Sequence, residues 1–189
     1  VVHPGDVKPQ QLGIGEADAK AAGAGWGRAQ WLWQDRVCSL SRVPVQPGTV
    51  MGQWQRKGVV LAASFAGSNP IEPVQRVLVT AEGLQPGLRD QLLGKLRQWH
   101  GQSSSKDALQ AVQSNLAHMA IAPCAQVRAL GQLADGLQLT ALSPALDIDL
   151  RYGVSVRNKA SDAARQFAEH LQASSTQAAA VQLGMAPVR

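Results

Sequence analysis

The chain has 189 residues, of which 45% are hydrophobic, and it carries a formal net charge of +5. This length can bury a sizeable core in one domain or in two small lobes. No apolar run approaches the roughly 20 residues that a membrane-spanning helix needs. The basic residues are scattered singly, with Arg56 and Lys57 as the only adjacent pair. That pattern is typical of a solvated surface, so the composition argues against membrane insertion and against a nucleic-acid partner.

The first 45 residues predict two strands after a start with little periodicity. Residues 1–25 are rich in Gly, Ala and Gln, and Leu12 with the alanines that follow it predicts a short helix at best. In the next stretch, polar and apolar side chains alternate around Trp31 and Trp33, which indicates a strand, and a second strand is expected at residues 37–43. The two tryptophans fit core packing better than ligand stacking.

A continuous apolar run at residues 59–63 predicts a strand that is covered on both faces, as in a parallel sheet. A small polar loop with Ser64, Ser68 and Asn69 follows it. Ligands of open α/β sheets bind beyond the carboxyl ends of the strands. The loop is therefore either a ligand-binding position or a turn that only ends the strand.

Two helices are expected next, at residues 74–85 and 88–99, because their apolar side chains recur on one face. Three serines, Ser103, Ser104 and Ser105, then precede a further helix, and a short strand is expected at residues 119–122. Serine hydroxyls beside the free N–H groups of a helix start are suited to an oxyanion. They are equally a normal way to cap a helix.

The C-terminal part predicts a strand at residues 152–156 and then two helices. Ser161 is a good N-cap for the first helix, and Ser174 or Ser175 begins the second, which Gly184 ends. The alternation of strands and helices along the chain predicts an α/β fold.

Residues for catalysis or metal binding are not indicated. The four histidines form no spaced ligand set, and neither a GxSxG nucleophile elbow nor a phosphate-binding loop is present. We therefore expect no catalytic residue, no metal site and no cofactor. Cys38 and Cys124 either form one disulfide in an oxidising compartment or remain two buried thiols.

The order of these features resembles a known family. Residues 151–187 run through a Tyr-Gly strand, an Ala-Ala-x-x-Phe-x-x-x-Leu helix and a Gly-x-x-Pro tail. Upstream stand Asn69-Pro70 after a buried strand, the polar loop 103–106 before a helix, and the short strand at 119–122. This order resembles the type 2 periplasmic solute-binding proteins, and most closely the molybdate-binding family of ABC importers.

The resemblance implies a periplasmic-binding-protein-like α/β fold of two small Rossmann-like lobes. The first lobe would comprise residues 1–42 and 143–189, and the second residues 43–142. Two hydroxyl-bearing loops of the family's first lobe would lie before Val1 in this register, which implies a truncated first lobe. The family often has a tyrosine after the short strand, whereas this chain has Pro123 at that position.

The resemblance also implies a function, which is passive binding of a small oxyanion such as molybdate between two lobes. The ligand would be held by neutral donors, with one arginine as an optional charge; the implied residues are Ser103, Ser104, Ser105, Ser68, Asn69, Gln75 and Arg76. The expected partner is an ABC permease or another protein. The chain lacks an N-terminal signal pattern, so we expect a mature exported chain in the periplasm.

A second interpretation belongs to a different functional class. The absent serine loops favour a binding-protein-like domain that has lost its transport ligand and acts as a protein-interaction or sensor module. An exposed apolar patch together with dimerisation would support this alternative. An enzyme is the least favoured interpretation.

Overall fold

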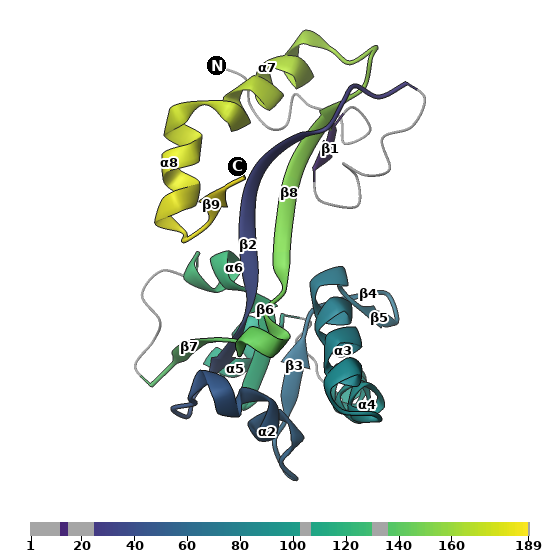
Figure 1. The fold of residues 1–189 in the computed structure, drawn as a ribbon, viewed down its shortest axis with the longest axis vertical. Helices are drawn as coiled ribbons and strands as arrows, with labels where there is room; N and C mark the ends of the chain where they lie inside the picture. Colours follow the sequence, from purple (N-terminus) through teal and green to yellow (C-terminus); the bar gives the residue numbers. More distant parts are fainter. Residues whose placement is uncertain (1–11, 15–24, 103–106, 130–135, 189) are drawn as a thin grey trace. The chain divides into compact units, whose positions relative to one another are not determined.

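The computed structural model describes residues 12–14, 25–102, 107–129 and 136–188 (Figure 1). The contacts divide the chain into two units. Unit 1 consists of Val1–Asp35 and Leu150–Arg189, and unit 2 of Arg36–Asp149. Residues 36–42 and 143–149, which the sequence assigned to the first lobe, lie in unit 2. The assignment of the two units to two ligand-binding lobes stays a prediction.

Unit 1 is built on a small antiparallel sheet in the order β1-β8-β2, and β9 also pairs with β2. Its elements are β1 (Leu12–Ile14), the first part of β2 (Gln30–Ser41), most of β8 (Asp149–Val156), α7 (Asp162–Gln172), α8 (Ser174–Gln182) and β9 (Ala186–Pro187). The first residue of β1 is opposite Val156. Helix α7 packs Ala168 against Leu32 and Val154 of the sheet.

The ends of the two C-terminal helices follow from local hydrogen bonds. The hydroxyl of Ser161 accepts from the backbone N–H of Ala164 at 3.3 Å, which satisfies one free donor of α7, as the sequence predicted. Helix α8 begins at Ser174. It is tied to β2 by the indole N–H of Trp33, which donates to Oε1 of Gln177 at 2.8 Å.

Unit 2 contains the second part of β2, which is antiparallel to β6 (Met119–Pro123) and to β7 (Gln138–Ala141). Strand β3 (Leu61–Ala63) lies parallel to β6, with Ala62 opposite Ala120. A parallel pair needs a long crossover, and here it consists of α3 (Glu72–Leu84), α4 (Leu88–Gln102) and α5 (Ala108–Gln113). Every residue of β3 and β6 is buried, which confirms the predicted buried strand over residues 61–63. Val59 and Val60 of the apolar run precede the strand, and Val60 is exposed.

Several short elements complete unit 2. They are η3 (Pro47–Thr49), α2 (Val50–Gln55), the hairpin β4 (Phe65–Ala66) and β5 (Asn69–Pro70), α6 (Cys124–Arg128) and η4 (Pro144–Leu146). Helix α2 is anchored by Trp54, which is fully buried. Its C-terminal end is closed by Lys95 of α4, whose ammonium donates to the carbonyl oxygens of Trp54 at 2.8 Å and Arg56 at 2.6 Å. Burial lowers the pKa of the Lys95 ammonium.

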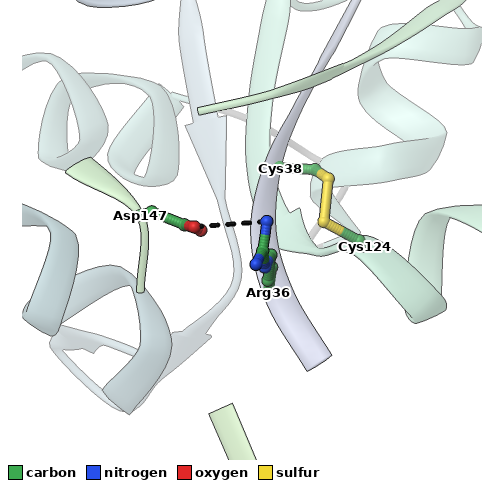
Figure 2. Close-up of a disulfide and its surroundings, with 4 residues drawn as sticks. All are labelled: Arg36, Cys38, Cys124 and Asp147. Atoms are coloured by element: carbon green, nitrogen blue, oxygen red, sulfur yellow. Dashed lines mark ion pairs between the residues drawn. A yellow bond between two sulfur atoms is a disulfide. The ribbon is translucent and has the colours of Figure 1, made fainter. Parts of the chain in front are cut away.

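A disulfide joins Cys38 of β2 to Cys124, the first residue of α6 (Figure 2). Both cysteines are buried. The bond decides between the two alternatives that the sequence left open. It lies wholly within unit 2 and closes a loop between residues 86 positions apart.

Two sequence predictions about elements were wrong, and two helices were missed. Leu12 lies in strand β1 rather than in a short helix. The two strands expected between residues 27 and 43 are a single strand of 12 residues, β2. The side chains in its first half are partly exposed and those in its second half are almost all buried. One continuous strand therefore shows two different sequence patterns. Helices α2 and α6 were not predicted, because each is too short for a helical periodicity to show.

Among the described residues, none of the helices combines the length and the apolar character needed to cross a bilayer.

Candidate ligand-binding site

The polar loop after β3 folds into the hairpin of β4 and β5. Phe65 pairs with Pro70, and Ala66 with Asn69, while Gly67 takes a φ of +62° at the turn, a conformation that glycine adopts without steric cost. The backbone N–H of Ile71 then donates to the carbonyl of Ser64 at 3.0 Å, which closes the loop. Ser68 and Asn69 are exposed on this hairpin. Their position beyond the carboxyl end of β3 is the one expected for ligand contacts in an α/β sheet.

Gln75 belongs to the first turn of α3 and holds the hairpin in place. Its Nε2 donates to the carbonyl oxygen of Pro70 at 2.6 Å. Its backbone N–H is already bonded to the carbonyl of Ile71 at 3.1 Å. The side chain is exposed, and an amide nitrogen carries two hydrogens, so one donor can serve a ligand while the other keeps its bond to Pro70.

Arg76 is engaged by neighbours on two sides. Its Nη2 donates to the backbone carbonyl of Asp149 at 2.8 Å, and its Nη1 lies 3.6 Å from Oε1 of Glu72, one helical turn away. The guanidinium therefore links α3 to the start of β8 within unit 2.

The three predicted serines, Ser103, Ser104 and Ser105, lie outside the described residues. The helix that follows them is capped by Asp107. Its Oδ1 accepts from the backbone N–H groups of Leu109 at 2.9 Å and Gln110 at 3.1 Å. Two amides of the first turn are thus already bound to a carboxylate, whose negative charge opposes an anion on the same turn. The sequence signal was present, because Asp is among the preferred N-cap residues.

An aromatic pair that the sequence did not predict joins the hairpin to α4. The rings of Phe65 and His100 stack with centroids 4.1 Å apart and an interplanar angle of 6°. His100 belongs to the last turn of α4, which extends past the predicted end at Trp99. No sequence pattern links these two residues, since their contact depends on how α4 packs against β3.

The carboxyl end of β6 carries no hydroxyl group in this chain. Pro123 ends the strand and is opposite Val37 of β2. The next residue is the disulfide-bonded Cys124. Nearby on β2, Nη1 of Arg36 lies 3.3 Å from Oδ2 of Asp147 (Figure 2). Because the Arg36 side chain is 63% exposed, this ion pair contributes little to stability.

The comparisons with known proteins give the family. Residues 42–186 match the model of the bacterial extracellular solute-binding proteins, which is more than half of the chain. The chain belongs to this family. A solute-binding role follows from the membership. No curated protein sequence matches the chain.

Solved structures similar to this solute-binding protein confirm the expected fold class, a periplasmic-binding-protein-like α/β fold. The periplasmic molybdate-binding protein of Azotobacter vinelandii superposes with a TM-score of 0.67 at 15% identity, covering 96% of this chain and 80% of that one. A substrate-binding domain assigned to a molybdenum ABC transporter of Clostridium difficile gives 0.57 at 22% identity, with 95% and 77% covered. Peb3 of Campylobacter jejuni gives 0.62 at 13%, with 93% and 78% covered.

The described part of the site is thus a surface at the carboxyl edge of β3. It brings together the hairpin with Ser68 and Asn69 and the first turn of α3 with Gln75. Arg76 lies on the same helix, with its guanidinium drawn to Asp149. Among the described residues, no group of three or more His, Cys, Asp or Glu side chains could hold a metal ion.

Proposed function

We propose that this protein binds a small oxyanion of the molybdate class and delivers it to an ABC permease in the periplasm. The family match over residues 42–186 is the observation that carries this proposal. Two of the similar structures are a molybdate-binding protein and a domain assigned to a molybdenum transporter, which makes molybdate the first ligand to test. The disulfide supports an oxidising compartment.

The proposed donors are neutral groups, of which the described ones lie at the carboxyl edge of β3. They are the hydroxyls and amides of Ser68, Asn69, Gln75, Ser103, Ser104 and Ser105. The carboxylate of Asp107 already occupies two amides of α5, so hydroxyls rather than the backbone of that helix would hold the anion. Arg76 would contribute a charge by exchanging its bond to Asp149 for one to the ligand. Binding would be passive, with selection by size and charge and with no chemical step.

The experiment is thermal unfolding with molybdate, tungstate, sulfate, phosphate and small carboxylates. A ligand at about 100 times its dissociation constant adds about 2.7 kcal/mol, which for this size raises Tm by roughly 5–10 °C. The double variant Ser104→Ala/Ser105→Ala should lose the shift. The matched control Ser174→Ala/Ser175→Ala changes two exposed serines of α8 and should keep it. No shift with any oxyanion would refute the transport function.

A second function is favoured by one observation on unit 2. Three exposed apolar residues, Val43, Val60 and Leu116, belong to chain segments whose backbones meet at His118. Its backbone N–H donates to the carbonyl of Val60 at 3.0 Å, and its own carbonyl accepts from Arg42. A protein-interaction or sensor module would use such an apolar surface. It predicts self-association or partner binding that Leu116→Glu abolishes, with no thermal response to oxyanions.

A further inference from the structure

Unit 1 contains a pocket of about 390 Å³, and its lining includes none of the residues proposed for the oxyanion. It is lined by the start of β2 and the residues before it, by the end of β8 and the residues after it, and by helix α7. Val154 and Ala168 are buried and Val156 is half-buried, so they form its apolar floor. Known small-molecule sites occupy roughly 300–1,000 Å³, and this pocket falls within that range.

The rim of the pocket is basic. Arg28, Arg157 and Arg165 line it and are exposed. Glu169 is the one carboxylate among the described residues that line it. Three guanidinium groups against one carboxylate leave two positive charges in excess. Guanidinium groups pair with carboxylate and phosphate oxygens through two parallel N–H donors.

Two of these arginines are held in position by neighbours within unit 1. The guanidinium carbon of Arg157 lies 5.2 Å from the ring centroid of Trp26, a cation–π arrangement. Nη2 of Arg165 donates to the backbone carbonyl of Asn158 at 2.9 Å. Side chains that are already placed lose less conformational entropy when they bind a ligand. Among the described residues, these contacts hold the two guanidinium groups in place beside the pocket.

We propose that this pocket binds a small organic oxyanion with a short apolar tail. The head group, a carboxylate or a phosphate monoester, pairs with Arg157 and Arg165, and the tail lies against the half-buried Val156. An inorganic oxyanion would leave the apolar floor unused, whereas a neutral apolar molecule would leave the guanidinium groups without a partner. The site is independent of the oxyanion site proposed in unit 2.

Calorimetric titration at low salt tests the proposal with four probes: acetate, hexanoate, inorganic phosphate and hexyl phosphate. A buried methylene contributes about 0.8 kcal/mol. Hexanoate should therefore bind at least about tenfold more tightly than acetate, and hexyl phosphate at least about tenfold more tightly than inorganic phosphate. The tighter of the two hexyl probes identifies the head group. Equal affinity of the hexyl probes and the bare head groups, or no binding at millimolar concentration, would overturn the proposal.

The matched variants separate the pocket from general charge effects. Arg157→Gln/Arg165→Gln should lower the affinity for the hexyl probe at least about tenfold, because two charged hydrogen-bond donors are lost. Arg97→Gln removes an exposed charge from α4 of unit 2 and should leave the affinity unchanged. An equal loss in both variants would overturn the proposal. The thermal response to molybdate should be the same in the double variant as in the wild type.

Discussion

Removal of the disulfide should destabilise unit 2 by several kcal/mol. The bond joins residues 86 positions apart, and the loop-entropy relation for that separation gives about 4.6 kcal/mol at 25 °C. This estimate is the contribution of the conformational entropy that the cross-link removes from the unfolded chain. Both cysteines are buried, so the variant Cys38→Ala/Cys124→Ala also leaves a small cavity. We therefore expect a loss of about 4–5 kcal/mol for the variant.

Guanidinium chloride unfolding, followed by far-ultraviolet circular dichroism, measures this loss. Wild-type protein should be compared with the double alanine variant and with wild-type protein denatured and refolded in reductant. Both should show a lower midpoint, and the variant should show a larger slope because its unfolded state is more expanded. A loss below about 1 kcal/mol would refute the reasoning. It would mean that the unfolded chain is already restricted between Cys38 and Cys124 without the bond.

Two further predictions concern hydrogen bonds of unit 2. Asp107→Ala should cost about 1 kcal/mol in thermal unfolding, because the cap of α5 is lost. It should also strengthen any oxyanion binding seen in the thermal assay, because a negative charge leaves the first turn; weaker binding in this variant would contradict the site as proposed. Glu82 accepts from the backbone N–H of Gly87 and Arg89 at 3.0 and 3.1 Å, and these bonds lower the pKa of its carboxyl. A carboxyl with a lowered folded-state pKa stabilises the fold above its unfolded-state pKa, and this contribution is lost as the pH falls through the folded-state value. The difference in Tm between wild type and Glu82→Gln should therefore shrink below about pH 4.5, and a difference independent of pH would contradict this role.

The parts of the fold that the sequence predicts are those with strong local patterns. The buried strand β3 follows from an unbroken apolar run, and α7 follows from its cap at Ser161 and its apolar face. Strand β2 was divided in two because its burial changes from one half to the other. Helices of five or six residues, such as α6 and α2, are shorter than two helical turns and leave no periodic pattern to detect.

The site was predicted less completely, because side-chain direction depends on packing between distant segments. The sequence placed Arg76 near an anion, but its guanidinium turns to the carbonyl of Asp149, 73 positions away. The stack of Phe65 on His100 joins β4 to the last turn of α4. Asp107 could have been assigned as a cap from the sequence alone, since it directly precedes the apolar face of α5. The roles of the three serines stay predictions.

The distribution of tryptophan gives the two units different optical properties. Trp54 and Trp99 of unit 2 are 0% and 5% exposed. Trp31 of unit 1 is 37% exposed, and Trp26 and Trp33 are half-buried. A dissolved quencher such as acrylamide therefore quenches the fluorescence of the tryptophans of unit 1 more strongly than that of the buried tryptophans of unit 2. Fluorescence quenching can thus follow the loosening of each unit separately in the unlabelled, unmodified chain.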